Sequence, residues 1–278
     1  MGLMESKLLQ ILARLVGINS IRSSLADGPG EAEIADHVYR HLKGLGIDTQ
    51  IQSVAQGRDN VVGLIAGSGN DKAILLNAHL DTVGTDGMKS PFELEQRDDR
   101  LYGLGAYDMK GSIAIMLLLA EHFVQQPPPI DVLLTFVADE EDESLGMEYL
   151  ADQWLPQLTQ KPEAGVFLEP TEEQIGIAHK GFTWFEIEIT GKAAHGSRPE
   201  EGIDAVLPLR AALGELEKIN SELKAAHADP LLGHASLHGG VIEGGSALSV
   251  IPARSRLRWE RRTLPAENQD TVNLELKR

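Results

Sequence analysis

The sequence predicts an α/β fold with a mostly parallel sheet, followed by a smaller second domain. Over the first 179 residues, short apolar runs typical of buried strands alternate with segments of helical periodicity. This alternation is typical of β-α-β units, in which helices cover the faces of a parallel sheet. Beyond that point polar and apolar residues alternate, as in strands with one exposed face. We therefore expect one domain over residues 1–179 and a second over 180–278.

Helices of the first domain are expected where apolar residues recur every three or four positions. These segments are residues 5–16, 31–45, 110–124 and 147–154. The second should end at Gly44 and Gly46, and the third before the prolines at 127–129, because proline cannot continue a helix. Strands of the same domain are expected at residues 49–54, 61–66, 73–78, 132–138 and 165–168.

The second domain has a different predicted order of elements. Strands are expected at residues 182–190, 235–242 and 254–260, and helices at 202–226 and from Pro265 onward. The order β-α-β-β-α is that of a ferredoxin-like split β-α-β unit, β-α-β-β-α-β, without its last strand.

Composition excludes several classes of function. The formal net charge of -17 argues against nucleic acids and anionic membranes as partners, since phosphate binding needs an excess of lysine and arginine. The chain has no cysteine, so a disulfide framework, a thiolate nucleophile and a cysteine zinc site are excluded. No apolar run approaches the ~20 residues of a membrane span. We expect a cytoplasmic protein whose metal, if any, is held by histidine and carboxylates.

His79 and Asp81 are the first candidate site residues. They follow the apolar run 73–76, at the C-terminal end of a predicted strand. Alternate residues of a strand point to one face, so His79 could bind a metal while Asp81 accepts a hydrogen bond from the other ring nitrogen. The alternative is a structural histidine at a strand end.

Three further segments bring acids to strand ends or just beyond them, the edge where ligands bind in α/β sheets. Asp108 lies in a glycine-rich turn, where it could instead cap the helix from Lys110. The charged run 139–143 could be a solvated loop. Alternatively, one of its carboxylates could bind a metal while the next acts as general base. Glu169 follows the strand at 165–168 as a ligand or an ordinary acid. One histidine with such carboxylates suits two zinc ions or similar cations.

The chain carries five ordered motifs: HLDTV at 79–83, LYGLGAYDMKG at 101–111, ADEE at 138–141, LEPT at 168–171 and GKAAHGSRPEEGIDAV at 191–206. Together they resemble the di-zinc amidohydrolase and metallopeptidase family of acetylornithine deacetylase, succinyl-diaminopimelate desuccinylase, carboxypeptidase G and aminoacylase. The resemblance implies hydrolysis of the amide bond of an N-acyl amino acid or small peptide by a metal-bound hydroxide. The sequence of the second motif is most similar to that of the acetylornithine deacetylase-like members.

The resemblance also implies residue roles. Two zinc ions, or cobalt or manganese in their place, would be held by His79, Asp108, Glu141 and Glu169. Asp108 would bridge the ions, and Glu141 would bind the ion that His79 does not. Glu140 would be the general base, and Asp81 would orient His79.

The second domain would then be an inserted lid that also forms a homodimer. In the family the histidine matching His195 crosses to the partner's active site and polarises the scissile carbonyl, and the arginine matching Arg262 contacts the substrate carboxylate. From the residues alone, His195 is a turn residue beside Gly196. Arg262 is a surface arginine in a basic run with Arg254, Arg256, Arg258 and Arg261.

The pattern departs from the family at the C-terminus. Relatives carry a further metal-ligating histidine there, which this chain lacks, so we expect a C-terminally incomplete relative. It should hold one metal more tightly than the other and have little hydrolase activity as a 278-residue chain. The alternative is a non-catalytic metal-binding relative, or a truncated fragment, that acts through its lid. A nucleotide-binding α/β protein is disfavoured, because the glycine-rich turn lacks the third glycine of a dinucleotide fingerprint.

Overall fold

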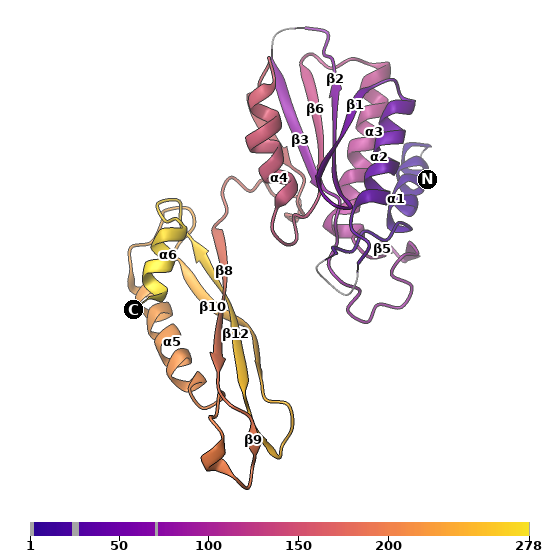
Figure 1. Ribbon diagram of the computed structural model, residues 1–278. Coiled ribbons are helices and arrows are strands. Elements are labelled where there is room, and N and C mark those ends of the chain that lie inside the picture. Colours follow the sequence, from indigo (N-terminus) through magenta and orange to yellow (C-terminus); the bar gives the residue numbers. More distant parts are fainter. Residues whose placement is uncertain (1–2, 24–27, 70–71, 278) are drawn as a thin grey trace. The chain divides into compact units, whose positions relative to one another are not determined.

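The computed structural model describes residues 3–23, 28–69 and 72–277. They belong to two compact units, Met1–Glu173 and Gln174–Arg278 (Figure 1). The second unit begins shortly before the expected boundary at residue 180 and reaches its first strand, β8 (Gly181–Thr190), directly after it.

The first unit is built on a five-stranded sheet in the order β1-β2-β6-β3-β7. The strands are β1 (Asp48–Ala55), β2 (Arg58–Ile65), β3 (Ala73–His79), β6 (Asp131–Val137) and β7 (Ala164–Phe167). β3 runs parallel to both β6 and β7, whereas β2 pairs antiparallel with β1 and β6. Four strands therefore run in one direction and β2 alone opposes them, so the predicted mostly parallel sheet is confirmed.

Helices cover both faces of this sheet (Figure 1). The helices are α1 (Leu3–Val16), α2 (Ala32–Gly44), α3 (Gly111–Gln125) and α4 (Leu145–Tyr149), the last continuing as helical turns to Gln157. α1, α2 and α3 pack on one face, where the larger core cluster includes Leu15, Leu117 and Phe136. A smaller cluster around Leu133 and Leu150 joins the opposite face to the helical segment after α4. These helices and strands match the predicted segments closely because their apolar periodicity is regular.

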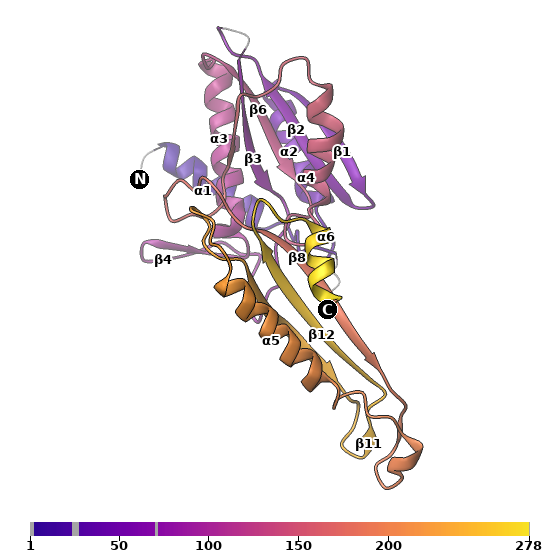
Figure 2. The same cartoon turned by 90° about the vertical axis from the view of Figure 1, so that its left-hand side faces the viewer.

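A hairpin of two three-residue strands, β4 (Glu95–Arg97) and β5 (Arg100–Tyr102), was not predicted. Figure 2 shows β4 projecting away from the central sheet. The residues of β4 are charged or polar and exposed, so this segment has no apolar alternation that would predict a strand.

The second unit has a three-stranded antiparallel sheet in the order β10-β12-β8. β10 spans Ser236–Gly244 and β12 spans Arg254–Thr263. α5 (Leu209–Ala225) and α6 (Gln269–Leu276) lie on the same side of the sheet, and a core cluster around Leu216 and Leu257 fills the space between helices and strands (Figure 1). A two-stranded pair, β9 (Ala194–His195) and β11 (Val250–Ile251), lies at the end of this unit away from α6 (Figures 1 and 2).

The prediction of a helix over 202–226 was wrong at its start. α5 begins at Leu209, because the Asp204 carboxylate accepts the backbone N–H groups of Val206 and Leu207 and forms a turn. Pro208 then disfavours the helical conformation of the residue before it. The helix expected from Pro265 likewise begins later, at α6, where Asn268 caps it through the Thr271 amide.

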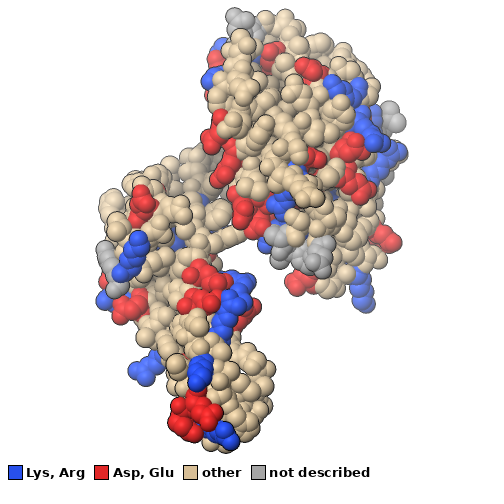
Figure 3. All heavy atoms as spheres, viewed as in Figure 1, with Lys and Arg blue, Asp and Glu red and all other residues tan. Residues whose placement is uncertain are grey.

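Charged side chains of both signs are interspersed on the face seen in Figure 3, among the residues that are described. Arg254 and Arg258, for example, pair with Glu188 and Glu186 across the exposed face of the second sheet. Within the described segments, no helix is both long and apolar enough to cross a bilayer.

Candidate metal centre

The parallel strands bring the candidate residues to one edge of the first sheet. β3 ends at His79, which pairs with Val137 at the end of β6, while Asn77 pairs with Phe167 at the end of β7. The segments after these strands therefore leave the sheet side by side. They carry Glu140, Glu141 and Glu169, and the turn before α3 adds Asp108.

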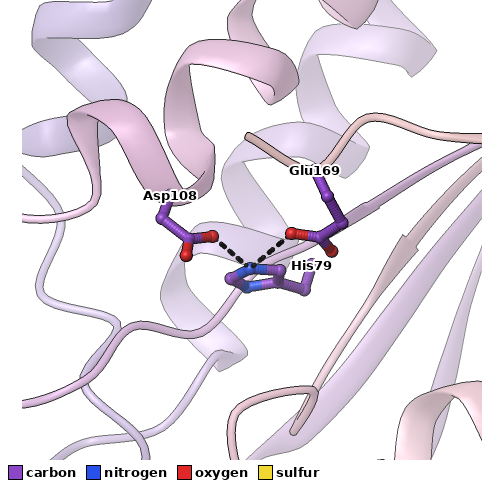
Figure 4. A group of neighbouring side chains, drawn as sticks. All are labelled: His79, Asp108 and Glu169. Carbon is purple, nitrogen blue, oxygen red and sulfur yellow. Dashed lines mark hydrogen bonds and ion pairs between the residues drawn. The ribbon is translucent and has the colours of Figure 1, made fainter. Parts of the chain in front are cut away.

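Two carboxylates converge on one nitrogen of His79 (Figure 4). The Nε2 atom of His79 lies 2.9 Å from Asp108 Oδ1 and 3.9 Å from Glu169 Oε2. The imidazole is 1% exposed, whereas the side chains of Asp108 and Glu169 are 48% and 38% exposed. The group is therefore buried behind His79 and open on the carboxylate side.

Asp81 holds the other side of the ring. His79 Nδ1 lies 3.1 Å from the Asp81 carbonyl oxygen and 3.5 Å from its carboxylate Oδ1. Because both atoms are acceptors, Nδ1 carries a hydrogen and the neutral ring keeps its lone pair on Nε2. Burial opposes ionisation of Asp81, but the contacts with His79 and with two backbone amides lower its pKa overall.

Without a cation, the acids around Nε2 hold a proton there. Burial lowers the pKa of His79, yet hydrogen bonds to Asp108 and Asp81, with the charges of Asp81 and Glu169, raise it to about 11. A metal ion that binds Nε2 must replace this proton, so metal affinity should rise with pH.

Glu140 and Glu141 form a second group of carboxylates near the same imidazole. Glu140 Oε2 is 4.0 Å from His79 Nε2, and ligand atoms of His79, Glu140 and Glu141 lie within 4.8 Å of one another. The same holds for His79, Asp108 and Glu169. Burial raises the pKa of Glu140, Glu141 and Glu169; His79 lowers it and neighbouring carboxylates raise it further.

The turn that carries Asp108 depends on Gly105. This residue has φ = 72°, and a Cβ atom there would lie 2.6 Å from Thr82 Cγ2. Its carbonyl accepts the backbone N–H of Lys110. The suggestion that Asp108 caps the following helix was wrong, since α3 has no side-chain cap and the Asp108 carboxylate contacts His79 instead.

A buried ion-pair network that was not predicted supports the loop of Glu140 and Glu141. Asp139, Arg58 and Glu31 are all buried, at 0%, 6% and 0% exposure. The Arg58 guanidinium pairs with Asp139, and its Nε lies 3.6 Å from Glu31 Oε2. Because Asp139 is buried, the solvated-loop interpretation is wrong for the first residue of the charged run. Isolated charges such as Glu31 and Arg58 carry no sequence pattern that would reveal this network.

Two smaller contacts hold the turn of Asp108 and the start of α3, one to the segment of Glu169 and one to the loop after α1. The Ser112 hydroxyl, at the start of α3, donates to the Leu168 carbonyl over 2.6 Å, beside Glu169. Lys110 Nζ donates to the Ile18 carbonyl over 2.7 Å, and burial lowers the Lys110 pKa to about 8.

His195 and Arg262 belong to the second unit. His195 ends β9 with an exposed side chain, and its Nδ1 contacts Ser197. Arg262 is 42% exposed, pairs with Glu260 over 2.5 Å and lies over the Phe182 ring. The neighbouring Arg261 is not a surface residue: it is fully buried and ion-paired with Glu267 and Glu275 of the segment leading into and through α6.

The donor set fits divalent metal ions of the zinc, cobalt or manganese type. One imidazole nitrogen with its far side hydrogen-bonded, together with clustered carboxylates, is the ligand chemistry such ions take. The mutual repulsion that raises the carboxylate pKa values would be offset by a bound cation. The four predicted ligands and the two supporting acids thus occur together in the first unit.

Comparisons with known proteins find a matching family model and similar sequences. A family model for peptidase family M20/M25/M40 matches residues 75–271. An acetylornithine deacetylase of Photorhabdus laumondii is 34% identical over 242 residues, or 84% of this chain and 60% of that protein. The chain spans 58% to 60% of the length of this relative and of two other curated ones, an acetylornithine deacetylase of Salmonella arizonae and a peptidase M20 domain-containing protein of Schizosaccharomyces pombe.

Solved structures share the fold. The di-peptidase Dug1p of Saccharomyces cerevisiae aligns with a TM-score of 0.79 at 16% identity, over 98% of this chain and 72% of that one. The M20 family metallo-carboxypeptidase Sso-CP2 of Sulfolobus solfataricus aligns with a TM-score of 0.76 at 18% identity, over 98% and 74% of the two chains.

Proposed function

The chain belongs to peptidase family M20/M25/M40, and from this premise we propose that it serves metal-dependent hydrolysis of the amide bond of an N-acyl amino acid or small peptide. The observation that carries the proposal is the convergence of Asp108 and Glu169 on His79 Nε2, with Asp81 behind the ring. Acetylornithine deacetylase and di-peptidase relatives support this substrate class.

Zinc is the metal we propose, with cobalt or manganese as substitutes. His79, Asp108 and Glu169 would hold one ion, and Asp108 and Glu141 the other. The first ion would have three of these ligands, which lie within 4.8 Å of one another, and the second only two, so we propose that the first is held more tightly. When bound, such ions polarise a carbonyl and acidify a water molecule.

Glu140 is the residue we propose as general base. It takes a proton from the attacking water and passes it to the leaving nitrogen when the amide bond breaks. Burial and neighbouring carboxylates raise its pKa, which makes it a stronger base for the proton it accepts and returns. Asp81 keeps His79 in the metal-binding tautomer.

The second unit is proposed as a lid and dimerisation module inserted into the catalytic domain. His195 would donate a hydrogen bond to the scissile carbonyl from a partner chain, and Arg262 would bind the substrate carboxylate. Because Arg262 pairs with Glu260, it would have to leave the Glu260 carboxylate to bind that of the substrate. We further propose a cytoplasmic homodimer that acts on small molecules.

Glu140→Gln tests the assignment of the base. The carboxamide keeps the shape of the side chain but cannot take a proton, so hydrolysis of N-acetyl and N-succinyl amino acids and dipeptides should be lost while zinc binding persists. Glu143→Gln, in the same charged run, is the matched control. Hydrolysis by wild type that survives in Glu140→Gln would refute the role of Glu140. Zinc binding without hydrolysis by wild type would favour the alternative, a non-catalytic relative or a truncated fragment that acts through its lid.

A further inference from the structure

His195 makes two contacts that determine where its ring carries hydrogen. The residue ends β9, pairs with Val250 of β11, and begins a turn in which Arg198 N–H donates to its carbonyl. Within this turn the backbone N–H of Ser197 donates to His195 Nδ1 over 3.2 Å. The Ser197 hydroxyl oxygen lies 2.8 Å from the same nitrogen.

The backbone contact has only one chemical interpretation. An amide N–H can donate but cannot accept, so Nδ1 must present its lone pair to Ser197. A neutral imidazole carries one hydrogen, which is therefore on Nε2. The hydroxyl can rotate to donate to Nδ1 as well, and this second contact restrains the ring.

His79 has the opposite arrangement. Its Nδ1 faces two oxygens of Asp81, both acceptors, so Nδ1 carries a hydrogen, and Nε2 offers a lone pair once a cation replaces the proton held there. The two histidines thus differ in which ring nitrogen acts as hydrogen-bond acceptor and which as donor. His79 offers a ligand for a cation, and His195 offers an N–H for an oxygen atom.

We propose that Ser197 is a positioning residue that fixes His195 as the Nε2–H tautomer and so makes it a neutral hydrogen-bond donor. The identity of the receiving atom, a substrate carbonyl oxygen that gains negative charge during hydrolysis, rests on the proposed function. The tautomer itself does not.

A neutral imidazole has an advantage over an imidazolium as the donor to the substrate carbonyl. It donates without first taking up a proton, so its contribution persists at a pH where an imidazolium would be absent. Removing one donor to a developing oxyanion typically lowers kcat by about 100-fold to 1,000-fold.

Nuclear magnetic resonance tests the tautomer directly on the 278-residue chain. In isotope-labelled protein at about pH 8.5, where imidazoles are ordinarily neutral, the two ring nitrogen shifts of His195 should show an unprotonated Nδ1 and a protonated Nε2. A scalar coupling across the hydrogen bond should join Nδ1 to the amide nitrogen of Ser197. His195→Gln identifies the resonances by their loss. A protonated Nδ1, or averaged shifts without the coupling, would overturn the proposal.

Variants of Ser197 distinguish the tautomer of His195 from its contribution to kcat. Ser197→Ala keeps the amide donor, so the coupling should persist while kcat falls about fivefold, the value of one hydrogen bond. Ser197→Thr should restore kcat. Ser221→Ala, which removes a hydroxyl bound to the Glu217 carbonyl in α5, is the control.

His195→Gln and His195→Asn test the donor position. Glutamine can place an N–H near the position of Nε2, and asparagine only near that of Nδ1, so His195→Gln should keep at least about tenfold more kcat than His195→Asn. Equal losses would contradict the donor role even where the resonance data establish the tautomer. Turnover by wild type is a test of the proposed function, and the resonance measurement does not depend on it.

Discussion

The carboxylate of Asp81 accepts the backbone N–H of Glu141 over 2.9 Å, through the oxygen opposite the one that accepts the N–H of Glu140 over 3.1 Å. One side chain at the end of β3 therefore holds both the imidazole of His79 and the loop that follows β6. The two sides of the candidate metal centre are joined through Asp81.

Replacement of Asp81 should weaken metal binding without removing a ligand. Asp81→Asn puts an NH₂ group where one of the two backbone amides now finds an acceptor, and it removes the charge behind His79. We expect zinc affinity to fall about 10-fold to 100-fold, as is typical for partners of metal-ligating histidines. Competition with a chromophoric chelator measures this change. Asp142→Asn, in the charged run 139–143, is the control, and equal zinc affinities of the two variants would contradict the role of Asp81.

The ion pair between Arg58 and Asp139 should contribute strongly to stability. Arg58→Met leaves Asp139 and Glu31 buried without their cation, and breaking a buried pair in this way costs about 3–5 kcal/mol. Urea unfolding at neutral pH measures the loss. Arg97→Met, which breaks an exposed pair with Glu95, should change stability little. A loss in Arg58→Met no larger than in Arg97→Met would exclude a stabilising network.

Glu31 should make stability depend on pH. Burial and the charge of Asp81 raise its pKa from 4.5 to about 7, against the effect of Arg58. The folded state then binds the proton more tightly than the unfolded state. The stability from this group is complete below about pH 4.5 and is lost as the pH rises through about 7, by roughly 3 kcal/mol.

Glu31→Gln removes this dependence because a carboxamide does not ionise. Unfolding free energies of wild type and variant, measured in urea across this pH window, should change with pH at different slopes. If wild type is the more stable at the low end of the window, the two free energies should converge as the pH rises. Glu33→Gln, at an exposed position in the first turn of α2, just after Glu31, is the control. Parallel curves for wild type and Glu31→Gln would show that Glu31 has an ordinary pKa.

The sequence predicts those features that depend on regular patterns. Apolar periodicity locates β3, β6 and α3, and the parallel strands then bring His79 and Glu169 to one edge of the sheet. Features that depend on single contacts are not predicted in this way. Asp204 forms a turn that delays α5, and Asp139 is buried because Arg58, distant in the chain, pairs with it. Neither partner is marked by spacing or composition.

Asp108 is the residue on which the proposed metal centre depends most, since it contacts His79 and would bridge both ions. Calorimetric titration of the metal-free chain with zinc, for wild type and Asp108→Asn, tests this most directly, with Asp99→Asn as a control and thermal unfolding as a check on folding. We predict that wild type and Asp99→Asn bind zinc, and that Asp108→Asn binds it more than about 100-fold more weakly, beyond the effect of losing a supporting residue. A folded Asp108→Asn that binds zinc as wild type does would contradict the account.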